Sequence, residues 1–377
     1  MDNMFGFADE LGPAKIIHVY EPAIGLKGIL VIDNVARGPS IGGLRIAPDV
    51  SANECFRLAR AMTLKNAAAD LPHGGGKMVI YGDPKMPLQQ KQQIVRAAAD
   101  SLRNEEDYIF GPDMGTNEEC MAWVRDEIGR SVGLPEELGG IPLDQLGATG
   151  WGLMHATEVA LQHLDFDLTE ARVAIQGFGS VGKHSARYLH DKGARIVAVN
   201  DSRGTVYNQQ GLDIEALFEL KKLGKSVADF SGGKTLERDA IIAIDCDIWI
   251  PAARPDVIHE GNVQQMRTKL IVQGANIPVT EGAEKYLYEH GVLCVPDFIA
   301  NAGGVICAAM EYKGATEHAA MTTIAEKVAG NTRKVLEISA NDGIQPREAA
   351  VKMATDRVKK AMALRRWSLF STAPHFL

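Results

Sequence analysis

Two lysines on either side of a glycine triplet are the residues of this sequence best suited to chemistry. They lie in MTLKNAAADLPHGGGK, where Lys65 falls in a helix-like run and Lys77 follows three glycines (74–76). Such a triplet is entropically costly unless the backbone must turn sharply or approach a ligand. Two lysines in a cleft lower each other's pKa, so one could exchange protons while the other holds a carboxylate. The alternative is a surface loop with two solvated lysines, and these residues alone do not decide between the two.

An aspartate in a second glycine-containing segment is a candidate proton carrier. Asp113 lies in GPDMGTN, between Pro112 and Met114. Residues of this kind usually form a turn, so the simpler interpretation is a turn aspartate. In the functional interpretation, its carboxylate projects into a cleft and moves protons to and from a substrate.

A third glycine-rich segment indicates a dinucleotide site. It matches G-x-G-x-x-G and consists of Gly177, Phe178, Gly179, Ser180, Val181 and Gly182. It follows an apolar run and opens a helical pattern, and Asp201 ends the next apolar run about 20 residues later. This context predicts a pyrophosphate held at the helix N-terminus, with the first glycine for the turn and the last for close packing. A glycine-rich turn without a ligand is the alternative.

Asp201 also bears on the choice of dinucleotide. A carboxylate there would bond both ribose hydroxyls of NAD and repel the additional phosphate of NADP. Arg203, two residues further on, could instead bind that phosphate. We favour NAD and keep NADP open.

The first half of the chain contains the elements expected to position the lysines. Two β-branched runs on either side of a Pro-Ala-Ile-Gly turn predict two strands within residues 15–33. Apolar spacing predicts helices over 52–70 and 87–103, and a short strand over 78–84 between them. These elements form an α/β unit.

The second half alternates strand and helix around the glycine motif. A helix is expected over 149–164 and another from the motif to about residue 192, and only helical patterns remain after residue 315. Alternation of this kind predicts a parallel, doubly wound sheet. Its strands are expected at 173–175, 196–199, 246–250, 270–272 and 292–295.

The expected fold therefore has two α/β domains with a cleft between them. Residues 1–140, together with a C-terminal helical part (331–377), would form a domain for substrate binding and oligomerisation. Residues 141–330 would form a Rossmann-type dinucleotide-binding domain. A length of 377 residues fits this division, because a single core rarely grows so large.

Composition excludes several other classes of function. The net charge of −8 arises from interspersed acidic and basic residues, with no basic stripe for nucleic acid. No apolar run reaches the length of a membrane span, and the first residues lack the pattern of a signal peptide, so we expect a cytoplasmic protein. The five cysteines have no metal-site spacing, and we expect no metal. Buried apolar side chains are the simplest interpretation of Cys55, Cys120, Cys246, Cys294 and Cys307.

Taken together, the motifs closely resemble the glutamate, leucine, phenylalanine and valine dehydrogenase family. The resemblance runs from about residue 15 to about residue 365. It implies NAD-dependent conversion of an L-amino acid to the 2-oxo acid and ammonia through an iminium, in a homo-oligomer of six or eight chains. The matching segments are GPSIGGLRIAPD (38–49), MTLKNAAADLPHGGGK (62–77), GPDMGTN (111–117), GATGWG (147–152), VAIQGFGSVGKH (173–184), IPAARPDVI (250–258), VQGANIPVT (272–280) and PDFIANAGGV (296–305).

The resemblance implies a role for each matching position. Lys65 would bind the substrate α-carboxylate, and Gly42 would offer its backbone to the substrate. Lys77 would polarise the carbonyl or activate water, and Asp113 would move a proton to or from the amino nitrogen. The residues implied on the nicotinamide side are Thr149, Asn301 and Asn276, of which Asn276 is also a substrate-binding candidate.

Two positions bear on which amino acid is used. Glutamate-specific members have a lysine before Gly-Gly-Leu-Arg and a serine three residues after the valine of NAGGV, whereas this chain has Ile41 and Ala308. An apolar pair would leave a substrate carboxylate unpaired, which favours leucine, valine or phenylalanine. GPDMGTN and residues 199–213 look more like the glutamate branch, so a glutamate dehydrogenase stays open. A catalytically inactive NAD-binding regulator is the alternative of another class, but Lys65, Lys77 and Asp113 are all present.

Overall fold

A computed structural model describes residues 5–370 and divides the chain into two compact units. The first unit comprises residues up to Pro142, Val305–Ala320 and residues from Val351 onward, and the second comprises Leu143–Gly304 and Met321–Ala350. The terminal segments 1–4 and 371–377, which the expected first domain includes, lie outside the described residues. Three helices contribute residues to both units, namely α10 (Gly303–Tyr312), α11 (Glu317–Asp342) and α12 (Pro346–Ala363).

The first unit is built on a five-stranded mixed sheet with the order β1-β2-β4-β3-β5. β2 pairs with both β1 and β4 in the antiparallel sense, whereas β3 runs parallel to β4 and β5. β3 therefore lies between the strand that carries Lys77 and the strand that leads to Asp113. The strands are β1 (Lys15–Glu21), β2 (Leu26–Asn34), β3 (Ser40–Ala47), β4 (Gly74–Tyr81) and β5 (Tyr108–Pro112).

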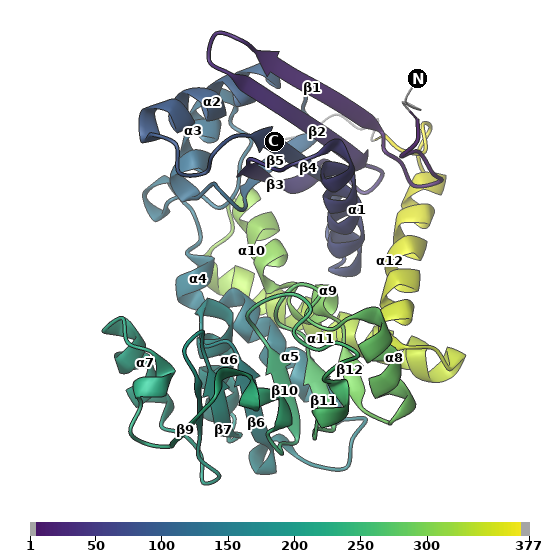
Figure 1. The fold of residues 1–377 in the computed structure, drawn as a ribbon. Coiled ribbons are helices and arrows are strands. Elements are labelled where there is room, and N and C mark those ends of the chain that lie inside the picture. The colour runs from purple at the N-terminus through teal and green to yellow at the C-terminus, as the bar shows by residue number, and fades with distance from the viewer. Residues whose placement is uncertain (1–4, 371–377) are drawn as a thin grey trace. The chain divides into compact units, whose positions relative to one another are not determined.

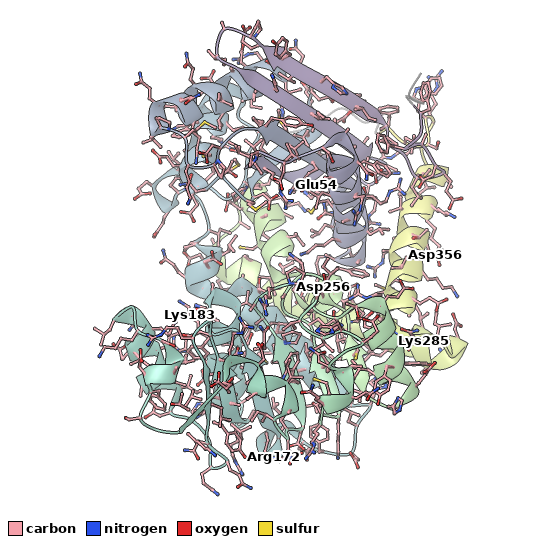
Figure 2. The ribbon with its side chains drawn as sticks, in the orientation of Figure 1. Glu54, Arg172, Lys183, Asp256, Lys285 and Asp356 are labelled. Atoms are coloured by element: carbon pink, nitrogen blue, oxygen red, sulfur yellow. The ribbon has the colours of Figure 1, made fainter. Side chains whose placement is uncertain are left out.

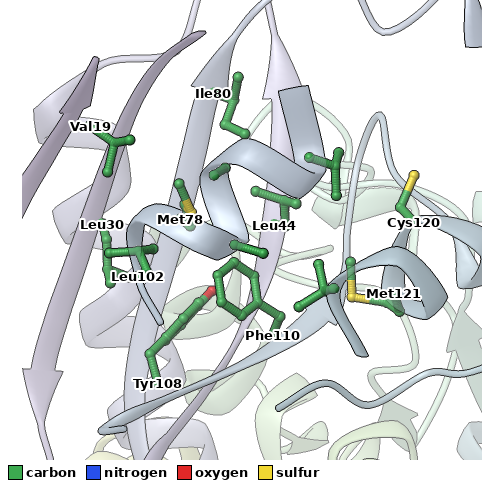
Figure 3. Close-up of a cluster of buried hydrophobic side chains, with 14 of the residues drawn as sticks. Val19, Leu30, Leu44, Met78, Ile80, Leu102, Tyr108, Phe110, Cys120 and Met121 are labelled. Carbon is green, nitrogen blue, oxygen red and sulfur yellow. The ribbon is translucent and has the colours of Figure 1, made fainter. Parts of the chain in front are cut away.

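Helices cover both faces of this sheet (Figure 1). On one face, α2 (Leu88–Ser101) and α3 (Glu118–Ile128) pack on the larger apolar core, which includes Leu30, Leu44 and Met78 (Figure 3). On the other face, α1 (Ala52–Ala68) packs Cys55 and Ala59 on a smaller apolar cluster. Because side chains alternate along a strand, Ile41, Gly43 and Arg45 of β3 share the face that α1 covers.

The glycine triplet lies inside β4 rather than in the loop expected from the sequence. A Cβ atom at Gly74 would lie 1.8 Å from the carbonyl oxygen of Asn34, and one at Gly75 would lie 2.0 Å from the backbone nitrogen of Thr63 on α1. The glycines are therefore needed because the neighbouring strand and helix approach this backbone closely. The expected strand at 78–84 consequently begins earlier and ends at Tyr81.

The second unit contains a seven-stranded sheet with the order β12-β11-β10-β6-β7-β8-β9. The five strands from β12 to β7 are parallel, which confirms the doubly wound sheet expected from the sequence. Two short strands that extend the sheet beyond β7 with antiparallel pairing, β8 (Thr205–Tyr207) and β9 (Lys234–Leu236), were not expected. The parallel strands are β6 (Arg172–Gln176), β7 (Arg195–Asn200), β10 (Ile248–Pro251), β11 (Leu270–Val272) and β12 (Leu293–Val295).

The α-helices of the second unit separate most of these strands in the chain. α6 carries the glycine motif at its N-terminus, and α5 precedes the sheet at residues near the expected bounds. The set comprises α4 (Leu143–Leu146), α5 (Ala148–Leu161), α6 (Ser180–Asp191), α7 (Ile214–Lys222), α8 (Glu281–Glu289) and α9 (Asp297–Ala300).

The division of the C-terminal helices differs from the expected one, which placed all residues from 331 in the first domain. In the first unit, the carboxylate of Glu311 accepts hydrogen bonds from the backbone nitrogens of Leu134 and Ile141. In the second unit, Arg347 donates to Glu284 and Trp151 donates to the carbonyl of Met321. These contacts group residues 305–320 with the first unit and 321–350 with the second.

Other expectations concern the chain as a whole. All five cysteines are buried, and none forms a disulfide. Across residues 5–370, no helix has both the length and the apolar content required to cross a bilayer. The same part of the chain brings no three His, Cys, Asp or Glu side chains into a group that could hold a metal ion.

Candidate active site

Lys77 and Asp113 form a direct ion pair in the first unit. The Nζ atom of Lys77 lies 2.6 Å from Oδ2 of Asp113, and the lysine side chain is only 7% exposed. Asp113 follows β5 in a turn, where its backbone nitrogen donates to the hydroxyl of Thr116. The turn interpretation and the functional interpretation of Asp113 are therefore compatible, because the turn places the carboxylate beside Lys77.

Arg45 is a third charged member of this group, and sequence reasoning did not identify it. Its Nε lies 2.9 Å from Oδ2 of Asp113, and its Nη1 lies 2.6 Å from Oε1 of Glu54. Glu54 lies in the first turn of α1, beside the sheet (Figure 2). Two cations and two carboxylates thus form a continuous chain of charged contacts. The signal in the sequence was the position of Arg45, two residues after Gly43 on the same strand.

Gly43 provides the space for the pair. A Cβ atom at this position would lie 2.7 Å from Cβ of Asp113 and 2.8 Å from Nζ of Lys77. Because β3 separates β4 from β5, the two side chains meet by passing over Gly43. A larger residue there would push them apart.

Burial and neighbouring charges set the protonation of these groups. Burial lowers the pKa of Lys77, and the charge of Arg45 lowers it further, although Asp113 partly opposes both effects. Burial alone would raise the pKa of Asp113, but Lys77 and Arg45 outweigh it, and the pKa falls below its ordinary value. The site therefore holds a lysine of lowered pKa beside an ionised carboxylate, a pair that can exchange protons with a substrate.

The substrate-binding candidates also lie on β3, on α1 and on α10. Gly42 is buried, and a Cβ atom there would lie 1.8 Å from the carbonyl oxygen of Gly76. Lys65 is half-buried on α1. The adjacent residue, Asn66, donates to the carbonyls of Gly74 and Ile41, which fixes this part of α1 against β3 and β4. Asn66 was not among the expected residues.

The two positions expected to select the side chain belong to the first unit. Ile41 is 4% exposed and lies on the β3 face that also bears Gly43 and Arg45. Ala308 is half-buried on α10. Both side chains are apolar, and neither can neutralise a carboxylate.

The second unit contains a pocket of about 350 Å³ at the glycine motif. It lies where β6, β7 and β10 end, and β6 is flanked by β7 on one side and β10 on the other. Ligands of doubly wound sheets bind at such a reversal of strand order. The lining includes Gln176, Gly177, Gly179, Asn200, Asp201, Lys221, Arg238 and Arg254.

The glycine motif fits a dinucleotide pyrophosphate. Gly177 has a φ of +96° and would place a Cβ atom 2.5 Å from that of Ala253. A Cβ atom at Gly182 would lie 1.8 Å from the carbonyl of Gly177, whereas Gly179 has open space beside it. The motif thus packs tightly at its first and last glycines and stays open at the middle one, which leaves space for a phosphate at the N-terminus of α6. Ser180 and Val181 form the first turn of that helix.

Asp201 lines the pocket, but protein groups already bind its carboxylate. It accepts hydrogen bonds from the Ser226 hydroxyl and the Arg203 backbone nitrogen, and also from the Val227 nitrogen and Lys221. Burial would raise its pKa, but these donors lower the pKa to about 2. The guanidinium of Arg203 pairs with Asp229 instead of lining the pocket.

Sequence reasoning missed the other charged groups of this pocket. Lys221 and Arg238 come from segments without a recognisable motif, and Arg254 lies in the matching segment 250–258 but was given no role, so only the fold shows that they line the pocket at the glycine loop. Asn200 accepts a hydrogen bond from the backbone nitrogen of Gly177 and thereby holds the loop against β7.

Two of the three nicotinamide-side candidates are in direct contact. The Asn301 amide donates to Oδ1 of Asn276 at 3.1 Å. Thr149 lies in the first turn of α5, packed against Gly303 of α10. All three belong to the second unit, so the structure brings them together with the glycine motif in one unit.

Comparison with known proteins agrees with this arrangement. The model of the glutamate/leucine/phenylalanine/valine dehydrogenase family matches residues 139–366, and that of the family's dimerisation domain matches residues 13–130. The glutamate dehydrogenase of Aeropyrum pernix is 36% identical over 359 residues, which are 89% of this chain and 85% of that protein. The NADP(+)-dependent glutamate dehydrogenase of Pyrobaculum calidifontis is 35% identical over 372 residues, which are 90% of this chain and 87% of that protein. The structure of the hetero-hexameric glutamate dehydrogenase from Thermus thermophilus, in its leucine-bound form, has a TM-score of 0.81 at 29% identity. The match covers 94% of this chain and 90% of that chain.

Proposed function

Because the chain belongs to the glutamate/leucine/phenylalanine/valine dehydrogenase family, whose members are amino acid dehydrogenases that use NAD or NADP, we propose that it acts on an L-amino acid with an apolar side chain. The products of oxidation are the 2-oxo acid and ammonia, and leucine, valine and phenylalanine are the candidate substrates. The observation that carries this choice is the buried apolar side chain of Ile41 on the face of β3 that bears the charged group.

In the proposed chemistry, residues of the first unit bind and activate the amino acid, and residues of the second unit hold the dinucleotide. Lys65 binds the α-carboxylate, with the backbone of Gly42 beside it. After hydride loss from Cα has given the iminium, Lys77 activates the water that adds to this carbon, and ammonia leaves. Asp113 moves a proton to and from the amino nitrogen. The glycine motif and Asp201 would hold the dinucleotide, and Thr149, Asn276 and Asn301 would surround its nicotinamide. When bound, the nicotinamide supplies hydride transfer.

Arg45 does not replace the lysine that glutamate recognition requires. Its guanidinium is already engaged by the carboxylates of Asp113 and Glu54. A third carboxylate, from a glutamate side chain, would meet Ile41 and remain unpaired, at a cost of several kcal/mol. This balance of charge supports an apolar substrate.

A glutamate dehydrogenase is the second candidate, and the comparisons favour it. The relatives from Aeropyrum pernix and Pyrobaculum calidifontis are both glutamate dehydrogenases. For this candidate, a cation other than Arg45 must reach the glutamate side chain. An inactive NAD-binding regulator is set aside, because the chain belongs to an enzyme family and retains Lys65, Lys77 and Asp113.

The proposal extends to cofactor and assembly. We propose that NAD is preferred to NADP, since Asp201 places a negative charge in the pocket where the additional phosphate would lie. A homo-oligomer of six or eight chains is proposed from the family resemblance, and the match to the dimerisation domain supports self-association. Light scattering that finds a monomer would contradict the assembly without affecting the chemistry.

A panel of L-amino acids tests the proposed function. The purified protein is incubated with NAD or NADP and each amino acid at alkaline pH, and formation of the reduced dinucleotide is followed. The expected result is turnover of leucine, valine or phenylalanine. Turnover of glutamate alone would select the second candidate, and absence of turnover with every amino acid would contradict both.

A further inference from the structure

We propose that Arg45 is a positioning residue for the reaction, which holds the carboxylate of Asp113 in place and puts a permanent positive charge beside the ammonium of Lys77. The inference rests on the proposed roles of Lys77 and Asp113. It adds a residue that touches neither substrate nor cofactor but sets the geometry and the charge of the groups that do.

The first support is the way in which Asp113 is shared. Nε of Arg45 and Nζ of Lys77 both contact Oδ2, at 2.9 Å and 2.6 Å. Within the described chain, Oδ1 accepts no hydrogen bond from either cation. Arg45 therefore orients the carboxylate so that one oxygen stays with Lys77 and the other remains available for the substrate nitrogen.

The second support is the anchoring of Arg45 itself. Its Nη1 lies 2.6 Å from Oε1 of Glu54, and only 18% of the arginine side chain is exposed. Glu54 is fixed in turn, because the hydroxyl of Ser51 caps α1 by accepting from the Glu54 backbone nitrogen. The guanidinium is thus bound at both ends and cannot turn toward a substrate carboxylate without breaking an ion pair.

The third support is the sign of the electrostatic effect on Lys77. A nearby positive charge disfavours the ammonium form, and Arg45 stays charged throughout the working pH range. Removing the charge of Arg45 would end this repulsion and would leave the negative charge of Asp113 to stabilise the lysine ammonium alone. Lys77 would then be harder to deprotonate. Asp113, Arg45 of β3 and Cys55 of α1 are the groups that act most strongly on Lys77. The elements around it also carry Glu54, Arg57, Arg60 and Lys65 on α1, Lys27 and Asp33 on β2, and Tyr108 on β5.

The test compares Arg45→Gln with Arg45→Lys in the full-length enzyme. For each variant, kcat/KM for the best amino acid is measured as a function of pH. Arg45→Gln should move the acidic limb of the profile up by about one pH unit, which is about tenfold in kcat/KM on that side. Arg45→Lys keeps the charge and should leave the limb in place. Titration of the substrate amine is common to all variants, so it does not contribute to the difference.

Arg60 offers a matched control. Its side chain is also 18% exposed, and it pairs with two carboxylates, Asp9 and Asp33, within the same unit. Arg60→Gln should lower thermal stability without moving the limb. If Arg45→Gln does not fold, Glu54→Gln gives the reverse test, because loss of a negative charge behind Arg45 should move the limb slightly to lower pH.

The outcomes separate this proposal from the proposed function. An unmoved limb in Arg45→Gln, or equal shifts in Arg45→Gln and Arg60→Gln, would overturn the role of Arg45. An upward shift in Glu54→Gln would overturn it too. If Lys77→Ala is inactive while the Arg45 variants leave the limb unmoved, only the inference about Arg45 fails. If Lys77→Ala is fully active, the proposed chemistry fails with it.

Discussion

Lys77 lies on β4 and Asp113 directly follows β5, two strands that are not neighbours in the sheet, yet Nζ of the lysine lies 2.6 Å from Oδ2 of the aspartate. The strand between them, β3, carries glycine at position 43, where a Cβ atom would lie 2.8 Å from the lysine nitrogen. The pair thus depends on a position that has no side chain. The buried lysine and ionised aspartate that result are the basis for the first prediction.

Replacing Lys77 by alanine should remove the acid–base group. We expect Lys77→Ala to lower kcat by about 10²–10⁴-fold, the usual contribution of such a group. Binding of NADH, measured by fluorescence titration, should be unchanged, because the glycine motif belongs to the other unit. Near-normal turnover in the variant would remove Lys77 from the mechanism, and lost NADH binding would indicate a folding defect instead.

A second prediction concerns stability at low pH. His73 is buried, and burial lowers its pKa to about 4, with the charge of Lys313 acting in the same direction. Between pH 6.5 and 4 the unfolded chain therefore binds a proton that the folded chain does not, so stability falls as pH falls through this window. The shift corresponds to about 3 kcal/mol. Above pH 6.5 this residue contributes no pH dependence.

His73→Gln is the variant that checks this prediction, since its side-chain amide can still donate to the Pro39 carbonyl that the ring nitrogen contacts. Chemical denaturation at several pH values gives the free energy of unfolding. The variant should show a shallower loss of stability between pH 6.5 and 4 than the unchanged protein. Identical slopes would mean that another group titrates in this window.

The fold class and the dinucleotide motif could be predicted because both depend on local pattern. Apolar runs separated by helical patterns predicted the five parallel strands of the second unit, and the glycines of residues 177–182 predicted the turn before α6. The short strands β8 and β9 were missed because three residues each are too few for a periodicity. The triplet 74–76 was expected in a loop but lies in β4. The glycines are needed there because α1 and β2 pack closely against this backbone, and a tertiary contact of this kind leaves no local pattern in the sequence.

The charged groups show the same limit. Lys77, Asp113 and Arg45 all stand beside glycine-containing segments, but no chemical role was predicted for Arg45, and Lys221 lies in no recognisable motif. Arg45 reaches Asp113 only because β3 lies beside β5, and Lys221 reaches Asp201 from α7. The hydrogen-bond partners of Asp201 could not be predicted from the sequence either, because Ser226 and Val227 come close to it only on folding.

The third prediction concerns the cofactor. Asp201 neutralises Lys221 at 3.1 Å in the dinucleotide pocket. Asp201→Ser should remove a charge that repels the additional phosphate of NADP and leave Lys221 available to bind it. We expect the ratio of kcat/KM for NAD to that for NADP to fall by at least about tenfold, or about 1.4 kcal/mol.

Two further variants locate this effect. Adding Lys221→Met to Asp201→Ser should cancel the gain with NADP. Arg203→Ala should change the ratio little, because that guanidinium pairs with Asp229 outside the pocket lining. An unchanged protein that already prefers NADP would overturn the assignment of Asp201.

The last prediction concerns the substrate side chain. Ile41 and Ala308 stand where glutamate recognition requires a lysine and a serine. A pocket built for a charged group rejects substrates that lack it far more strongly than an apolar pocket discriminates by size. The double variant Ile41→Lys/Ala308→Ser should therefore raise activity on glutamate relative to leucine, and Ile41→Leu, which keeps the apolar volume, serves as its control.

The most direct test is the ratio of kcat/KM for leucine, valine or phenylalanine to kcat/KM for glutamate in the unchanged protein. We predict that the best apolar substrate exceeds glutamate by at least about tenfold, or about 1.4 kcal/mol of differential transition-state binding. A ratio that favours glutamate would contradict the account and require a cation, other than the engaged Arg45, at the end of the substrate side chain.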